Sequence, residues 1–427
     1  MSRKSKKGAA KKSSKKGGES AAAAKKSSGS KSASKKPGAS KTIEPKISLE
    51  DLFPPDLKAS WETEAVNLQR ENILSARDAY RRRGLVLYIG AGISCSVGLP
   101  SWWDMIRALT VTMMTRRVGS SLEALKGFSE EQKALARIKI QEEVAQGAGA
   151  DKSILIMARA IKDFFGDRLP HEVALSLYRP FLSSNLSALR RLLFKAGGQP
   201  GGSLTEYQTI RESKLFRAIV QLARAQRDVR GVQAIVNFNY DDLIEESMRE
   251  QGIRCDTLLS GREESRDASL PCYHVHGVLP FRKIQELRPT GNNDSRNVIG
   301  NFVFSEDEYH TEYSDPYRWS NMTMINQLGR YSGLFVGLSL QDPNLRRLLD
   351  VTHRQYPEIT NYAILTRNTP RGQDAHTKQS ILRDMFEKVE TESFANIGVH
   401  VIWTDKFEEV PDRILEICDI DADEGEG

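Results

Sequence analysis

The chain has 427 residues and a hydrophobic fraction of 39%, which suits one large or two ordinary globular domains. It contains no apolar run long enough for a membrane span, and its charged N-terminus has no apolar stretch behind it, so a membrane protein and a secretory signal are not expected. The net charge of +6 comes from residues 1–46, where fifteen Lys and Arg face only Glu19 and Glu44. The remainder is net acidic, and we expect a cytoplasmic protein.

Both ends of the chain have the composition of disordered segments. Residues 1–46 are mostly Lys, Ser, Ala and Gly and cannot bury enough apolar surface to offset chain entropy. This basic tail would bind a nucleic acid through counterion release, or it is only a solvated segment, and the sequence leaves both open. Residues 416–427 form a short acidic tail.

Four cysteines, Cys95, Cys255, Cys272 and Cys418, lie far apart in the chain. None belongs to a CxxC pair, so neither a disulfide framework nor a zinc ribbon is indicated. We therefore expect no metal.

The first chemical signal is a glycine turn after a buried strand. Leu85–Ile89 is a continuous apolar run, typical of a parallel strand covered on both faces. Gly90 and Gly92 allow a tight turn and a close approach to a ligand, and a following helix would direct free N–H groups at a pyrophosphate. The third glycine of the dinucleotide fingerprint is replaced by Cys95, so an ordinary dehydrogenase site is not indicated, and a purely structural turn remains open.

Helical periodicity dominates the region around this strand. The spacing of apolar residues over Trp61–Arg83 predicts a helix that leads into the first strand. Several amphipathic segments with interrupting prolines follow Trp103, and they predict a helical insertion over residues 105–230. The catalytic domain would then comprise residues 47–104 and 231–415.

A second buried run, Gln233–Asn237, ends in polar residues. Asn239, Asp241 and Asp242 follow it and would lie at the carboxyl edge of a parallel sheet, where open α/β sheets bind ligands. Either aspartate would also serve as a helix cap, and we favour that role for Asp242. For Asn239 we favour a functional role.

The segment Pro271–Pro280 reads PCYHVHGVLP and predicts a strand that ends near Gly277. His274 and His276 are two residues apart and would share one face of that strand. We predict a structural role for His274. An isolated strand histidine is usually structural, and the site role of His276 depends on the resemblance described below.

Two later segments complete the pattern. FVFSEDEYHTEY contains Glu306, Asp307 and Glu308, which are more typical of a solvated helix N-terminus than of a metal site. Leu334–Leu338 predicts a further strand, after which Asp342 is expected to cap a helix.

Apolar runs near residues 85, 233, 272, 334, 361 and 399 alternate with helices. This alternation predicts an α/β fold, a doubly wound (Rossmann-like) parallel sheet of about six strands with a large helical insertion domain.

Four motifs in chain order, GAGIS, NYD, HG and GLS, resemble those of the sirtuin family of NAD-consuming proteins. The resemblance implies that Asn239 handles the nicotinamide ribose and a water, that Asp241 holds nicotinamide, and that His276 is the general base. The same resemblance assigns the phosphates and riboses of NAD+ to Gly90, Ala91, Gly92, Ser94, Gly337 and Ser339.

Two departures separate this chain from sirtuin deacylases. It lacks their four-cysteine zinc module, and Pro100–Trp103 replaces their Pro-Asp-Phe-Arg continuation. With its helical insertion, the chain is similar to the NAD-hydrolysing effectors of bacterial anti-phage defence. The expected activity is NAD+ glycohydrolysis to nicotinamide and ADP-ribose, without a metal.

The resemblance also implies regulation and partners. A gated enzyme is expected, in a homo-oligomer or with a helicase-like (HerA-type) ATPase. An NAD-dependent protein deacylase and a nucleic-acid-binding subunit of a defence complex are the alternatives. The sequence does not give the oligomeric state, the partner or the trigger.

Overall fold

The fold is described from a computed structural model of the chain. It describes residues 55–124, 154–179, 212–261, 269–283, 299–300, 302–367 and 378–419. It also describes residues 210, 263 and 265 and single residues between 129 and 142. The expected basic tail at residues 1–46 lies outside these residues, as do residues 420–427.

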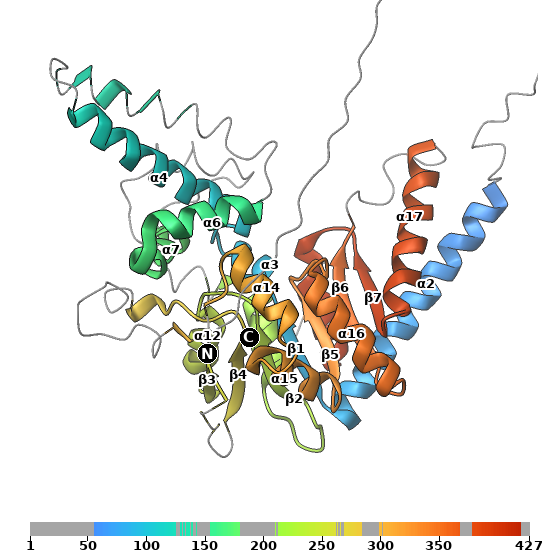
Figure 1. Cartoon of the computed structure of the whole chain (residues 1–427). Helices are drawn as coiled ribbons and strands as arrows, with labels where there is room; N and C mark the ends of the chain where they lie inside the picture. Colours follow the sequence, from blue (N-terminus) through green and yellow to red (C-terminus); the bar gives the residue numbers. More distant parts are fainter. Residues whose placement is uncertain are drawn as a thin grey trace, which may run out of the picture. The chain divides into compact units, whose positions relative to one another are not determined.

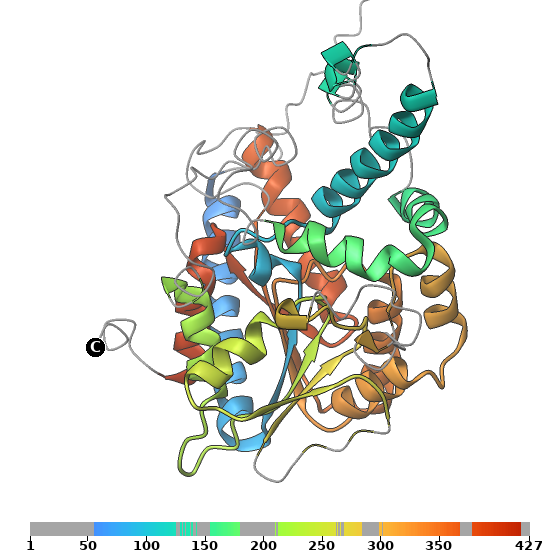
Figure 2. The same ribbon diagram turned by 90° about the vertical axis from the view of Figure 1, so that its left-hand side faces the viewer.

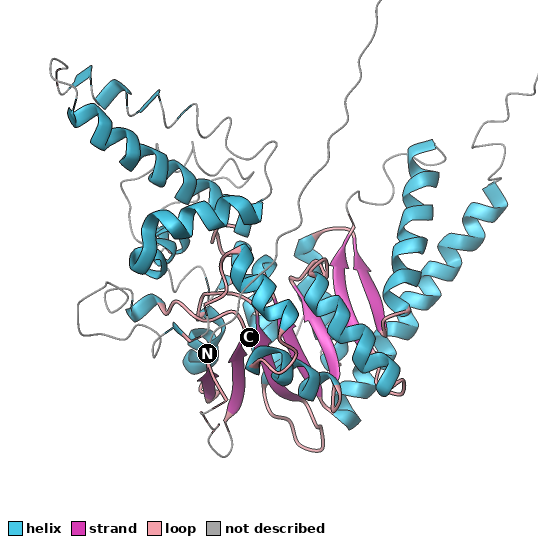
Figure 3. Cartoon of the chain, viewed as in Figure 1, coloured by secondary structure: helices cyan, strands magenta, loops and turns pink. Residues whose placement is uncertain are grey.

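Seven strands form one sheet in which every neighbouring pair is parallel (Figure 3). The order across the sheet is β3-β4-β2-β1-β5-β6-β7. The strands are β1 Leu85–Ile89, β2 Val232–Asn237, β3 Cys255–Leu258, β4 Leu270–His274, β5 Ser332–Val336, β6 Asn361–Thr366 and β7 Val399–Thr404. The expected α/β fold with a parallel sheet is therefore confirmed.

Alternate residues of the central strand face two separate hydrophobic cores. Leu85, Leu87 and Ile89 pack into one core, and Val86 and Tyr88 pack into the other. Since both faces are covered, the strand is apolar throughout, as the period-two geometry of a buried strand requires.

Helices cover both faces of the sheet (Figures 1 and 2). One core includes residues of α2 Pro55–Asp78, the π-helical turn η1 Ala79–Arg83, α11 Lys214–Ala223, α12 Leu243–Glu250 and α18 Val410–Cys418. The other includes residues of α15 Trp319–Leu328, α16 Pro343–Gln355 and α17 Lys378–Ala395. The remaining described elements are α3 Ala91–Cys95, α4 Trp102–Ala124, α6 Ile154–Phe165, η2 Gly166–Arg168, α7 Leu169–Leu177, α14 Glu306–Ser314 and η4 Phe407–Glu409. Within the described ranges, every helix is too short or too polar to span a bilayer.

The sheet has one strand more than the sequence indicates. β3 was missed because it is four residues long, lies at the sheet edge and is only partly buried. At the other end of the chain, α18 continues to Cys418, and Asp419 forms an ion pair with Arg77 at 2.7 Å. The start of the expected acidic tail is therefore folded.

The described helices in the range predicted as an insertion are α4, α6 and α7, which pack on one another, and α11, which packs on α18. Polar contacts join this region to the elements around the sheet. Lys162 of α6 lies 2.7 Å from Asp307 and also contacts Glu308, both in the first turn of α14. These two acidic residues therefore begin a helix, as expected, and also hold the insertion.

Another of these contacts involves Asp242, which occupies the N-cap position of α12 without a side-chain capping bond. Its Oδ1 instead accepts from the Phe281 amide at 3.1 Å and lies 3.2 Å from the Tyr178 hydroxyl, which donates to the Leu279 carbonyl at 2.8 Å. The expected capping role is thus wrong for its side chain. Burial and the neighbouring charge of Glu245 raise the pKa of Asp242 from 3.8 to about 7.

Replacing Asp242 with Asn should stabilise the protein at alkaline pH. Because the folded-state pKa lies above the ordinary value, the wild type loses stability as pH rises from 3.8 towards 7. Asp242→Asn removes the buried charge and keeps an oxygen for the Phe281 amide. We expect the Tm of the variant to exceed that of the wild type by a few degrees at about pH 8, and by less at about pH 5.

The matched control is Asp163→Asn, in which an exposed carboxylate of α6 is replaced. Its Tm difference should be small and independent of pH. A lower Tm for Asp242→Asn at both pH values would contradict the assigned burial cost.

Candidate functional site

The carboxyl ends of β1 and β5 meet where the sheet reverses its strand order. The chain builds β2, β3 and β4 on one side of β1 and then returns to place β5, β6 and β7 on the other side. In open α/β sheets the ligand binds at such a switch point. The glycine turns predicted from the sequence follow these two strands.

The two glycine turns touch each other. The Gly90 amide donates to the Val336 carbonyl at 3.1 Å, and the Gly92 amide donates to the Gly337 carbonyl at 3.0 Å. A Cβ atom on Gly92 would lie 2.9 Å from the Cα of Gly337, and Gly337 has a φ of +69°. Only glycines permit this approach and this backbone conformation.

The contact corrects one expectation about α3. The Gly92 N–H is bound to Gly337, and the Ile93 N–H donates to the Gly90 carbonyl at 3.1 Å, so these amides do not point freely at a ligand. Ala91 and Ser339 are exposed at the same two turns. Any backbone cradle for phosphate would therefore use the exposed parts of the turns.

A hydrogen-bonded chain joins the first turn to the residues after β2. The Asn239 side-chain amide donates to the Gly90 carbonyl and to Ser94 Oγ, both at 3.0 Å. Ser94 Oγ donates to Asp241 Oδ2 at 2.7 Å, and Asp241 Oδ1 accepts from the Leu243 amide at 3.3 Å. Three sequence-predicted residues, Ser94, Asn239 and Asp241, are therefore brought together and buried.

These hydrogen bonds fix the orientation of the Asn239 side chain. Both hydrogens of its side-chain amide are used, so its Oδ1 is the atom that remains to accept a hydrogen bond. Within the described part of the chain no group donates to it. Asp241 is held by Ser94, and burial raises its pKa although the Ser94 hydrogen bond opposes this shift.

His276 follows β4 as Asn239 follows the neighbouring β2. Asn237 of β2 pairs with His274 of β4, and the two site residues each follow two positions later. The His276 ring makes edge contacts with Phe238 at 5.2 Å and with Tyr309 of α14 at 5.7 Å between centroids. Burial lowers its pKa and outweighs the charges of Asp342 and Glu312, so the ring is neutral near neutral pH.

The expected common strand face of the two histidines is wrong. β4 ends at His274, so His276 lies in the turn that follows and is free of the strand alternation. His274 is fully buried, which agrees with a structural role. The predicted cap is confirmed at Asp342, whose Oδ1 accepts from the Leu345 amide of α16 at 2.9 Å.

The site also includes residues that the sequence did not indicate. Tyr309 faces His276 from α14, and the buried Glu312 on the same helix contacts Arg318 at 2.5 Å. The detectable signal was the capping box formed by Ser305 and Glu308, which marks the start of that helix. The sequence predicts the helix but not its proximity to His276.

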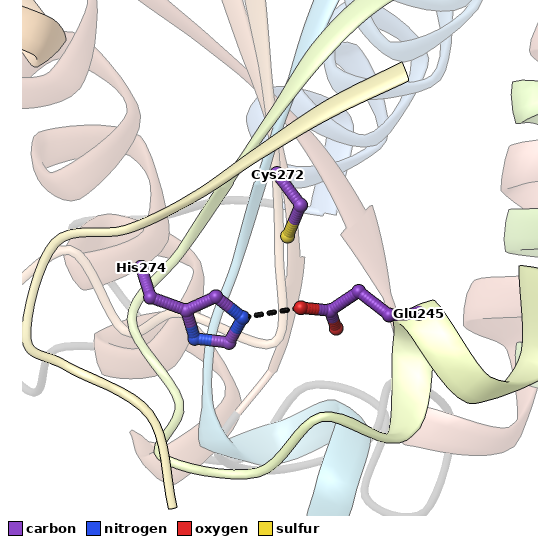
Figure 4. Close-up of side chains that lie close together, drawn as sticks. All are labelled: Glu245, Cys272 and His274. Atoms are coloured by element: carbon purple, nitrogen blue, oxygen red, sulfur yellow. Dashed lines mark hydrogen bonds and ion pairs between the residues drawn. The ribbon is translucent and has the colours of Figure 1, made fainter. Parts of the chain in front are cut away.

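Three side chains of the kinds that bind metals also gather near the site. Glu245, Cys272 and His274 have ligand atoms that all lie within 4.8 Å of one another (Figure 4). Their positions in the chain do not follow any zinc-ligand spacing, and for that reason the sequence did not indicate them.

A surface groove of about 160 Å³ lies elsewhere, between α2 and α17 beside the edge strand β7. Trp61, Leu68 and Trp403 contribute to its lining. This groove shares no residue with the hydrogen-bonded polar residues that follow β1 and β2. The candidate site is therefore identified by its position at the switch point of the sheet and by its polar residues.

Comparison with known families agrees with this geometry. Residues 233–389 match the family model described as SIR2-like domain, a range that contains Asn239, His276 and Gly337 but begins after the β1 glycine turn. A comparison with curated proteins found no match. SIR2-like domains use NAD+, so an NAD-dependent activity is indicated. The parallel sheet flanked by helices is consistent with a Rossmann-like SIR2-like fold, and residues 233–389 carry the SIR2-like domain match.

Proposed function

We propose that the protein is an NAD+ glycohydrolase that cleaves NAD+ into nicotinamide and ADP-ribose. The observation that carries this proposal is the chain from Asn239 through Ser94 to Asp241 at the switch point, with a neutral His276 on the neighbouring turn. These groups suit the transfer of a ribosyl group to water.

The reaction breaks the bond between the nicotinamide nitrogen and the anomeric carbon of ribose. A water oxygen forms the new bond to that carbon, and nicotinamide leaves with the electron pair of the broken bond. The Oδ1 of Asn239 would accept a hydrogen bond from the attacking water, and His276 would take the proton that the water releases. Cleavage of this kind passes through an oxocarbenium-like state, so a positioned water and a nearby base are the main requirements.

The remaining residues would bind the dinucleotide. Ala91 and Ser339 are exposed at the two touching turns and are suited to contact riboses and phosphates. Gly90, Gly92 and Gly337 allow those turns to meet. Ser94 accepts a hydrogen bond from Asn239 and donates one to Asp241. Asp241 would bind the nicotinamide carboxamide.

The placement of the cysteines favours water over an acyl-lysine as the nucleophile. Cys95 lies in α3, Cys255 and Cys272 on β3 and β4, and Cys418 at the end of α18, so they form no four-cysteine module beside the site. Trp102 begins α4 and packs edge-on against Phe304 at 5.2 Å, where deacylases continue their first motif differently. A deacylase activity would appear as nicotinamide release that depends on an acylated peptide.

The first prediction is nicotinamide release from NAD+ by the purified full chain without any peptide. His276→Ala and Asn239→Ala should each lower kcat by roughly 100-fold or more, the usual contribution of a positioned acid–base group. The matched control, His310→Ala, replaces an exposed histidine one residue from Tyr309 on α14 and should keep the wild-type rate. Folded variants of His276 and Asn239 with near-normal rates would refute the site assignment.

The pH profile should reflect a base with a lowered pKa. Since His276 must be neutral to accept a proton and burial lowers its pKa, kcat/KM should stay constant down to below about pH 6.5 and then fall. Rates at several pH values, with thermal stability followed in parallel, would measure this limb. An acid limb above the ordinary histidine value would show that His276 is not the base.

We further propose that the helical insertion gates this activity, in an effector of anti-phage defence that depletes NAD+. The support is structural continuity between the insertion and the base. Lys162 of α6 binds Asp307 and Glu308, and Tyr309, the next residue of α14, touches His276. Arg159 adds a fourth charge at 3.4 Å from Asp307. A movement of α6 would therefore reach the catalytic histidine through one helix.

Assembly is the natural trigger for such a gate. A second copy of the chain, or a helicase-like ATPase, would bind the insertion and shift α6. A partly exposed ion-pair network contributes on the order of 1 kcal/mol, which is enough to shift a two-state equilibrium several-fold.

Lys162→Met should raise the basal rate of nicotinamide release several-fold and weaken its dependence on protein concentration. Lys214→Met, on the exposed face of α11, is the matched control and should change neither. Rates are measured over a range of protein concentrations. If the wild-type rate per subunit is independent of concentration and of added partner, and Lys162→Met equals the wild type, the gate does not exist.

A further inference from the structure

A buried acid–base pair that the proposed mechanism does not use lies beside the backbone of Asn239. His274, the last residue of β4, is fully buried, and Glu245 of α12 is 2% exposed. The ring Nε2 lies 2.5 Å from Glu245 Oε1 (Figure 4). Thr257 of β3 also donates to this oxygen at 3.2 Å. Burying two ionisable groups is costly, so a pair in this position requires a reason.

The pair makes a direct contact, since His274 Nε2 and Glu245 Oε1 lie within hydrogen-bond distance of each other. Burial also raises the pKa of the nearby Cys272 well above its ordinary value, which keeps it a neutral thiol.

The second ring nitrogen of His274 contacts a residue of the candidate site. Its Nδ1 lies 3.2 Å from the backbone carbonyl of Asn239. A carbonyl only accepts hydrogen bonds, so Nδ1 carries a proton and donates it. The Nε2 proton is donated to Glu245, so both ring nitrogens are donors with fixed partners.

Asn239 is consequently held on both sides of its backbone. Its amide donates to Asn237 Oδ1 at 2.9 Å, while its carbonyl accepts from His274. These two contacts fix the main chain from which the side chain reaches Gly90 and Ser94. The direction of Asn239 Oδ1 therefore depends on the contact between His274 and the Asn239 carbonyl.

We propose that His274 is a positioning residue for Asn239, with Glu245 as the group that holds its ring. The proposal rests on the proposed function, because its consequence is a change in turnover. A displacement of about 1 Å at a reacting group is able to cost 100-fold in rate, so a lost contact here should lower kcat more than it changes KM.

Two amide replacements separate the two contacts of the ring. The nitrogen of an asparagine side chain lies close to the position of histidine Nδ1, whereas that of glutamine reaches the position of Nε2. His274→Asn should keep the bond to Asn239, and His274→Gln should lose it. Both are made together with Glu245→Gln, so that neither leaves a buried carboxylate unpaired.

The expected result is an unequal loss of turnover at similar Tm. The Asn variant should stay within a few-fold of the wild-type kcat, and the Gln variant should fall roughly 10- to 100-fold with KM for NAD+ nearly unchanged. Equal kcat values in the two variants, or losses that follow Tm, would overturn the proposal and leave His274 as packing only.

A readout that needs no turnover separates this proposal from the proposed function. In crystal structures of the two variants, the Asn239 side chain should remain at Gly90 and Ser94 with Asn at position 274 and move away with Gln. If the wild type releases no nicotinamide, the glycohydrolase proposal fails, and these structures still decide the positioning role.

Metal analysis of the full chain completes the test. We expect no stoichiometric zinc in the purified protein and no change in metal content or rate in Cys272→Ala. One zinc per chain that is lost in Cys272→Ala would show that the pair and the thiol form a metal site, and would overturn the positioning role.

Discussion

The contact between the two glycine turns is the constraint on which the site depends. The turn after β1 and the turn after β5 approach until a single Cβ atom would collide, with the Gly92 amide bonded to the Gly337 carbonyl. This approach fixes α3 at the centre of the sheet, and α3 carries Ser94. Because Ser94 links Asn239 to Asp241, the polar chain of the site exists only while the turns touch. The glycines serve here as packing residues first, and a contribution to phosphate binding would come from the exposed parts of the same turns.

The sequence predicts most of this arrangement because the central strands are buried on both faces. β1 was predicted with its observed bounds and β2 to within one residue at each end, since continuous apolar runs leave little choice of register. β3 was not predicted, because its sequence CDTL is short and polar and lies at the sheet edge, where burial imposes no pattern. The end of β4 was misplaced for a related reason. Val275 continues the apolar run of that strand, although it already lies in the turn.

Partners distant in the chain are what the sequence does not contain. Asp242, which the sequence predicted as a helix cap, instead contacts the amide of Phe281 and the hydroxyl of Tyr178, both of which are brought near by the tertiary structure. The acidic residues Asp307 and Glu308 begin a helix as their composition predicts, but their contact with Lys162 depends on the insertion. Residue type and local pattern thus identified the chemically active side chains, whereas packing determined which of them interact.

The buried acidic groups near β2 show how the fold distributes charge. Asp241, Asp242 and Glu245 lie within five positions of one another and are all nearly excluded from water. Three unpaired carboxylates there would repel one another strongly, and this repulsion is reduced in a different way for each residue. Asp241 accepts from Ser94, Asp242 has a pKa raised to about 7, and Glu245 is paired with His274. Among the three, only Glu245 has a cationic partner, and the ring of that partner also binds the Asn239 backbone. The same cation that makes Glu245 tolerable in the interior therefore also holds the residue that would direct water at the substrate.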